Sequence, residues 1–240
     1  MTIPDKAPLP RDDDSPGPVG AWLAPGYFLL YLAYLFWSRE SDALHWVSLV
    51  TIPLLVVLVI DLKAGGTLGT TLGSFGLRRR NLSGGLWLTL AIGVVLGMVQ
   101  LFLSRSGPAV MEAFASGRAL YLFPLAFVLM LLTAGFTEEF FFRGFLQTRL
   151  EFLSGSGWWG VILTSILFGI YHLPYAYFNP NWPSAGDWGA AWGASLGQGI
   201  PAGLILGWVY IRSRGNLVAC VLLHALVDTF PAMGLLKFGG

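Results

Sequence analysis

The sequence predicts an all-α protein, a polytopic transmembrane helical bundle of about seven or eight spans. Of the 240 residues, 55% are hydrophobic and only 11% are charged, whereas a soluble domain carries about 25% charged residues. The mean hydropathy is +0.67. Apolar runs of roughly 20 residues, the length that crosses a bilayer as a helix, recur along the chain. We therefore expect an integral membrane protein in contact with the lipid bilayer.

Seven apolar runs are long enough to be spans, and Trp and Tyr crowd their ends as in interfacial belts. The fourth run is longer than a bilayer requires, so we expect it to tilt. The sixth contains Gly199, Pro201 and Gly203. It is expected to kink or split into two half-helices, which would give the eighth span. The expected spans are 20–37, 44–62, 86–104, 119–147, 158–174, 189–211 and 216–235.

The chain divides into three parts. Residues 1–18 are rich in Pro and Asp and have no apolar segment, so they predict a disordered tail and not a signal peptide. Residues 19–118 hold the first three spans. Residues 119–235, the membrane core, hold the remaining spans and the ionisable side chains expected deep in the bilayer.

Lys and Arg in the connecting segments predict that the N-terminus is cytoplasmic, as in a bacterial-type plasma membrane protein. With that orientation nine cations lie inside and four outside. The run of three arginines after the second span is expected to anchor the topology and attract anionic lipid. The net charge of +1 gives no reason to expect nucleic acid as a partner. The inside cations are Lys6, Arg11, Lys63, Arg78, Arg79, Arg80, Arg149, Arg212 and Arg214, and the outside ones Arg39, Arg105, Arg118 and Lys237.

The membrane core carries ionisable residues that are costly inside a bilayer and therefore mark function. Glu139 and Arg143 are four residues apart, the spacing of an ion pair on one helix face. Glu138 points away from that pair. Desolvation makes such an unpaired carboxylate a stronger base, which suits a general base. Glu139 and Arg143 are expected to support it.

Two further spans carry histidines. His172 follows Phe168 by four residues in the fifth span, and His224 precedes Asp228 by four in the seventh. The second spacing lets Asp228 orient the imidazole. Counted from the expected cytoplasmic ends at 1.5 Å per residue, Glu138 lies about 15 Å deep, His172 about 20 Å and His224 about 12 Å. Similar depth on three spans favours one shared cavity.

Two other residues are expected to have no catalytic role. His45 stands beside Trp46 at the start of a span, so we interpret it as an interfacial residue. Cys220 lies in an apolar run and is the single cysteine, which excludes an intramolecular disulfide.

A carboxylate and two imidazoles can deliver water to a peptide bond. Glu138 with His172 would hold and deprotonate the water, and His224 with Asp228 would stabilise the oxyanion. Glu138, His172 and His224 are also an acceptable catalytic zinc set, although the H-E-x-x-H motif is absent. A divalent metal such as zinc therefore stays open as a cofactor, and no other cofactor is indicated.

Three motifs in order, Glu-Glu-x-x-x-Arg, Phe-x-x-x-His and His-x-x-x-Asp, resemble those of the CAAX protease and bacteriocin-processing (CPBP, or Abi) family. The resemblance covers residues 119–235, which it implies are the catalytic core of an intramembrane endopeptidase. It implies that Glu138 and His172 activate water while His224 and Asp228 stabilise the oxyanion. Prenyl-protein members usually have Asn where this chain has Asp228, and that departure concerns the substrate more than the chemistry. The implied substrate is a peptide or protein, lipidated or anchored in the membrane.

Two other functions are compatible with these residues. Buried Glu, His and Arg also build proton relays, and a helix broken by Gly and Pro suits a transport site. However, the chain does not divide into two similar halves, which disfavours a proton-coupled transporter. The second alternative is a non-catalytic scaffold or immunity protein of the same family, against which the complete set of site residues argues.

Overall fold

The computed structural model describes residues 18–39, 44–77, 82–103 and 106–236, and within these ranges all regular elements are helices. The predicted all-α membrane bundle is confirmed. In chain order the elements are α1 (Pro18–Trp37), η1 (Val47–Thr51), α2 (Ile52–Lys63), α3 (Leu68–Ser74), α4 (Leu82–Leu103), α5 (Gly107–Ala115), α6 (Ala119–Met130), η2 (Leu131–Gly135), α7 (Phe136–Glu139), η3 (Phe140–Gln147), α8 (Thr148–Ser154), α9 (Gly157–Tyr171), α10 (Leu173–Phe178), α11 (Trp188–Arg212) and α12 (Leu217–Leu235), where η marks a π-helix.

Six helical segments of the described chain are long and apolar enough to cross a membrane. They match six of the seven predicted spans. The one predicted span without a match is the second, 44–62. It is present as η1 and α2, which run without a break from Val47 to Lys63 but are shorter than the other six segments. The six segments are Gly20–Trp37, Ser83–Phe102, Ala119–Ser154, Gly157–Phe178, Trp188–Arg212 and Leu217–Leu235.

The prediction that the sixth span splits is wrong, because α11 is a single continuous helix. Its glycines serve close packing instead. A Cβ atom at Gly199 would lie 2.6 Å from the Cα atom of Gly169, and one at Gly203 would lie 2.8 Å from the Cα atom of Ser165. These contacts let α11 approach the backbone of α9. The eighth span that a split would have produced is therefore absent from this segment.

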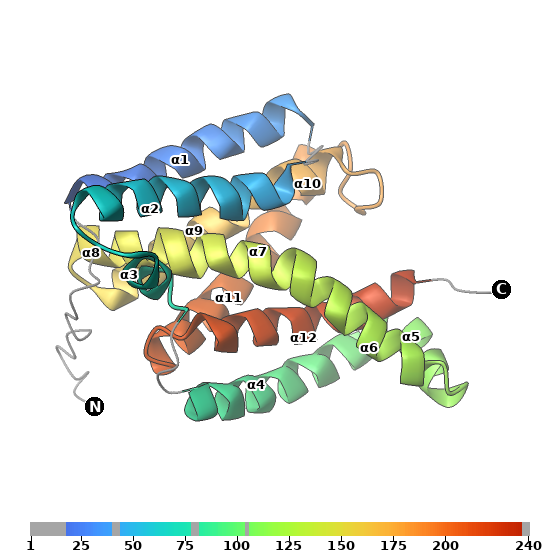
Figure 1. Ribbon diagram of the computed structural model, residues 1–240. Coiled ribbons are helices and arrows are strands. Elements are labelled where there is room, and N and C mark those ends of the chain that lie inside the picture. The colour runs from blue at the N-terminus through green and yellow to red at the C-terminus, as the bar shows by residue number, and fades with distance from the viewer. Residues whose placement is uncertain (1–17, 40–43, 78–81, 104–105, 237–240) are drawn as a thin grey trace, which may run out of the picture.

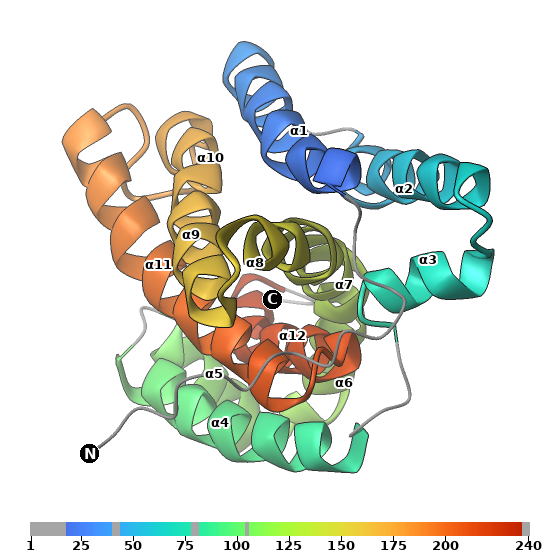
Figure 2. The ribbon, with the colours of Figure 1, turned by 90° about the vertical axis from the view of Figure 1, so that its left-hand side faces the viewer.

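The segment Ala119–Ser154 is the axis of the bundle. It continues through α6, η2, α7, η3 and α8, and so extends beyond the predicted end at residue 147. Figure 2 looks along the bundle and shows α8 surrounded by α1, α9, α11 and α12. Every residue of η3 is buried, including four aromatic rings and Arg143. This placement keeps water away from the polar side chains on the axis.

Gly144, in the middle of η3, allows α3 to approach the axis. A Cβ atom there would lie 2.7 Å from the backbone oxygen of Phe75. We expect Gly144→Ala to destabilise the protein by about 1–3 kcal/mol, because backbone must move to admit the methyl group. The measurement is thermal unfolding in detergent.

Gly193→Ala in α11 is the matched control. A Cβ atom at Gly193 would meet no atom within 4 Å, and alanine is favoured over glycine in a helix by up to about 1 kcal/mol. The control is expected to be neutral or slightly stabilising. Equal stability of the two variants would contradict the close approach at Gly144.

The loops of the bundle alternate between its two ends (Figure 1). The start of α1, the α2–α3 connection, the α8–α9 turn and the α11–α12 turn share one end. One expectation about charge is corrected: Arg149, assigned to a cytoplasmic loop, is buried in α8 at 1% exposure. Its guanidinium donates to the backbone oxygens of Gly144 and Phe145. Of the expected tail, 1–18, residues 1–17 lie outside the described residues, as does the Arg78–Arg80 anchor, while Pro18 already begins α1.

Candidate active site

Three helices bring the predicted acid and imidazoles together. Glu138 lies on α7, His172 caps the end of α9, and His224 is in the first half of α12. The Oε2 atom of Glu138 is 4.0 Å from Nε2 of His172 and 3.9 Å from Nε2 of His224. One carboxylate oxygen therefore faces both imidazoles.

Glu139 links two of the motifs. Its Oε1 atom accepts from Nη1 of Arg143 at 2.8 Å and also lies 2.7 Å from Nδ1 of His224. The Glu139–Arg143 pair expected from the four-residue spacing is present. The contact with His224 was not expected, because it joins residues 85 positions apart in the chain. Glu139 thus holds His224 as well as Arg143.

Asp228 contacts the opposite side of the His224 ring. Its Oδ2 atom lies 3.3 Å from Nε2 of His224. The imidazole therefore has Glu139 at one nitrogen, and Asp228 and Glu138 at the other. Both ring nitrogens of His224 thus face carboxylate oxygens, to which an imidazole N–H can donate.

Phe168 fills the space between the charged groups. The guanidinium carbon of Arg143 lies 4.7 Å from the centre of its ring, a cation–π contact. The His172 ring centre is 4.6 Å away and that of His224 is 6.1 Å away. The Phe168 ring therefore contacts both imidazoles and covers the guanidinium of Arg143.

The backbone selects the tautomer of His172. Its Nδ1 atom lies 2.8 Å from the carbonyl oxygen of Phe168. A carbonyl only accepts, so Nδ1 carries the proton and Nε2 of the neutral ring is an acceptor. Two acceptors, Nε2 and the Glu138 oxygen, then face each other at 4.0 Å. That separation exceeds a hydrogen bond of about 2.7–3.2 Å and suits one water that donates to both.

Exposure increases across the cluster. The side chains of Glu139 and Arg143 are fully buried, those of Glu138 and His224 are about one-tenth exposed, and Asp228 is 34% exposed. The cluster is therefore most exposed on the side of His172 and Asp228, and the ion pair behind it is buried.

The predicted zinc alternative fits this geometry poorly. Donor atoms about 2.0–2.2 Å from a tetrahedral ion are roughly 3.3–3.6 Å apart, less than the 3.9 and 4.0 Å separations from Glu138. His224 Nε2 is also occupied by Asp228. Across the described ranges, no three His, Cys, Asp or Glu side chains are grouped as metal ligands.

His45 lies closer to the cluster than the sequence indicated. Its Nε2 atom is 2.8 Å from the hydroxyl oxygen of Thr137, the residue before Glu138. That hydroxyl donates to the backbone oxygen of Thr133, so it accepts from His45. Trp46 stacks on Phe136 with ring centres 5.4 Å apart. The start of the second predicted span thus holds α7 in place, a role beyond the interfacial one expected.

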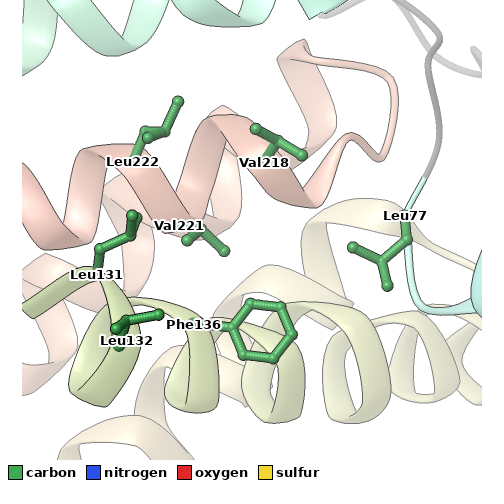
Figure 3. A pocket seen from close by; sticks show the side chains of 7 residues that line it. All are labelled: Leu77, Leu131, Leu132, Phe136, Val218, Val221 and Leu222. Atoms are coloured by element: carbon green, nitrogen blue, oxygen red, sulfur yellow. The ribbon is translucent and has the colours of Figure 1, made fainter. Parts of the chain in front are cut away.

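An apolar cavity of about 300 Å³ lies between η2, α7 and the start of α12 (Figure 3). No member of the carboxylate–imidazole cluster lines it. The lining is entirely aliphatic or aromatic, so the cavity offers no group for proton transfer. The lining residues are Leu77, Leu131, Leu132, Phe136, Val218, Val221 and Leu222.

The fold and the cluster define a class: a polytopic helical membrane protein with carboxylates and imidazoles gathered between its spans. Residues 119–230 match the family described as Type II CAAX prenyl endopeptidase Rce1-like. This segment belongs to the CAAX protease and bacteriocin-processing family, a family of membrane peptidases, which confirms the predicted family. Searches of curated proteins and of solved structures return no significant match.

Proposed function

We propose that this chain is an intramembrane peptidase that uses a water molecule activated by Glu138 and His172. The observation that carries the proposal is the single oxygen of Glu138 that faces both imidazoles, at 4.0 and 3.9 Å. A carboxylate in this position can accept a proton from water. The match of residues 119–230 to a peptidase family supports the same chemistry.

In the first step the water donates hydrogen bonds to Glu138 and to Nε2 of His172. Its oxygen attacks the carbonyl carbon of the scissile peptide bond, and one proton passes to the Glu138 carboxylate. Because Nδ1 of His172 donates to the carbonyl oxygen of Phe168, the lone pair on Nε2 is free to accept from the water. The residues thereby supply a positioned nucleophile without a covalent intermediate.

In the second step His224 faces the developing oxyanion. The N–H at Nε2, which faces Asp228 at 3.3 Å before substrate binds, donates instead to the former carbonyl oxygen. Asp228 orients the ring and does not need to donate, which accounts for a carboxylate where prenyl-protein relatives have an amide. As the intermediate collapses, the C–N bond breaks, and Glu138 returns its proton to the leaving amine. The products are a carboxylate and an amine.

The clustering favours this function over the two alternatives. A proton-coupled carrier does not need an acid and two imidazoles around one water. A scaffold or immunity protein does not need the His172 tautomer to be fixed or His224 to be held at both nitrogens. Neither alternative requires side-chain exposure to fall from Asp228 to the buried Glu139–Arg143 pair.

The substrate class that we propose is a peptide or protein, lipidated or anchored in the membrane. We also propose a plasma-membrane location with a cytoplasmic N-terminus. The start of α1 and the α2–α3, α8–α9 and α11–α12 connections, all predicted to face the cytoplasm, lie at one end of the bundle (Figure 1). The test is reconstitution in liposomes with two quenched fluorescent peptides, one ending in a farnesylated CAAX sequence and one carrying a transmembrane segment. Cleavage of either supports the proposal. If neither is cleaved by the intact protein, the peptidase assignment fails.

We predict that hydrolysis is metal-independent. The cluster supplies a base, an orienting imidazole and an oxyanion donor without an ion. Chelator-washed protein is expected to keep its activity with less than about a tenth of an equivalent of metal, whereas a catalytic zinc site loses its nucleophile with its ion. Elemental analysis beside the peptide assay decides. Stoichiometric zinc that restores lost activity would instead make Glu138, His172 and His224 ligands.

A further inference from the structure

A buried row of polar side chains continues away from the active site along the bundle axis. Glu139, Arg143, Gln147 and Glu151 follow one another at intervals of four residues and are all buried. Nη1 of Arg143 donates to Glu139, and Nε2 of Gln147 donates to Oε1 of Glu151, both at 2.8 Å. We call these four residues the polar ladder. Glu139 joins the ladder to His224 at its inner end.

The ladder is bound to α11 through two glycine carbonyls. Nη2 of Arg143 donates to the backbone oxygen of Gly203 at 3.3 Å, and Nε2 of Gln147 donates to that of Gly207 at 3.4 Å. Both acceptors lie on one face of α11, four residues apart. A Cβ atom at Gly207 would be 3.0 Å from Oε1 of Gln147. The absence of a side chain at Gly207 lets Gln147 reach the backbone there, whereas a Cβ atom at Gly203 would meet Ser165 of α9.

The two middle members have complementary atoms that lack partners. Nε of Arg143 is a buried donor and Oε1 of Gln147 a buried acceptor, and neither has a hydrogen-bond partner among the described residues. Residues four apart on a helix are neighbours on its surface. Arg143 and Gln147 therefore lie side by side on this helix and bind neighbouring turns of α11.

We propose that Gln147 is a positioning residue for the hydrolysis, acting through Arg143 and Glu139 on His224, with Glu151 as the outer end of the network. This inference rests on the proposed peptidase function. A single oxygen, Oε1 of Glu139, accepts from both Arg143 and His224. A movement of the Arg143 guanidinium therefore shifts the Glu139 carboxylate and changes the electrostatic field at the His224 imidazole.

The guanidinium of Arg143 is held by three contacts. Phe168 covers the face of its guanidinium, and Glu139 and Gly203 take the two terminal nitrogens. Its Nε atom has no hydrogen-bond partner among the described residues, and Gln147 stands one turn further along the same helical segment. Gln147 in turn is held by Glu151, so the order of action runs from Glu151 inward to His224.

The test compares Gln147→Met with the exchange Gln147→Glu/Glu151→Gln. Methionine keeps the volume and removes both polar atoms. The exchange keeps an acceptor at 147, a donor at 151 and the net charge. Gln198→Met, at an exposed position of α11, is the matched control for a Gln-to-Met change. We expect Gln147→Met to lower kcat about 10- to 100-fold, as supporting residues do, with KM within about twofold, and we expect the exchange to restore most of kcat.

A second readout follows His224 directly and does not depend on activity. The chain has three histidines, so ¹⁵N-histidine labelling gives three imidazoles, assigned with His45→Gln and His172→Gln. We expect Gln147→Met to move the ¹⁵N signals of His224 and to leave those of His172 in place. The exchange should return the His224 signals to their original positions.

The outcomes separate this inference from the proposed function. If the intact protein cleaves no peptide, the peptidase function fails, and the His224 signals still decide whether Gln147 positions that ring. Unmoved His224 signals in Gln147→Met, or an equal loss of kcat in Gln198→Met, overturn the inference. If Gln147→Met does not fold, Glu151→Gln, which preserves volume, is measured in its place. Its His224 signals support the inference if they move and overturn it if they do not.

Discussion

Glu138→Gln is expected to abolish peptide hydrolysis while the protein folds and inserts normally. The amide cannot accept the proton of the attacking water, and general base catalysis contributes about 10²- to 10⁴-fold to the rate. Glutamine has almost the same shape, and removing a charge from a span eases insertion. The measurement is kcat/KM on whichever reconstituted peptide the intact protein cleaves, alongside the thermal unfolding temperature in detergent.

Glu112→Gln is the control for this change, since it makes the same substitution at a carboxylate that is 72% exposed. It should keep full activity. A Glu138→Gln protein that cleaves peptide at the normal rate would end the assignment of Glu138 as the base. Loss of folding in that variant would show instead that the carboxylate has a structural partner.

The spans could be predicted because hydropathy alone determines which segments can enter a bilayer. Six predicted runs reappear as helices of similar length. The sixth span is present, but its expected split was wrong, because a proline and two glycines usually break a helix in water. Here Gly199 and Gly203 instead allow α11 to pack on the backbone of α9, and sequence alone does not distinguish these two uses.

Local spacing predicted contacts within one helix, and not those between helices. The pairs Glu139–Arg143 and His224–Asp228 are four residues apart and are in contact. By contrast, the contact of Glu139 with His224 depends on how two spans pack. His45 is a similar case, because its partner Thr137 is 92 residues away and no motif connects them.

The polar ladder could have been found from the sequence. Its four members recur every four residues from Glu139 to Glu151, which is the helical rule already applied to the first pair. It was missed because the span was ended at residue 147, and Arg149 was then counted as a loop cation. In the structure the helix continues to Ser154, and both Arg149 and Glu151 are buried.

Arg143→Ala is expected to destabilise the protein by about 3–5 kcal/mol, because removing one partner of a buried ion pair leaves the other charge uncompensated. Arg143 and Glu139 have no exposed side-chain surface. The substitution also exposes the ring face of Phe168 and frees the carbonyl of Gly203. His224 stays in contact with Glu139 and offsets part of the loss. The measurement is the free energy of unfolding in detergent.

Arg118→Ala provides an unusually close control for this prediction. The Arg118–Glu112 pair has the same 2.8 Å separation but side chains that are 38% and 72% exposed, and exposed pairs contribute about 0–1 kcal/mol. Distance is thus held constant while burial changes. A second comparison uses Glu139→Gln/Arg143→Met, which leaves no uncompensated charge and should recover part of the stability lost in Arg143→Ala. If Arg143→Ala destabilises the protein no more than Arg118→Ala does, burial adds nothing to the pair, and Arg143 cannot be the support that holds Glu139 against His224.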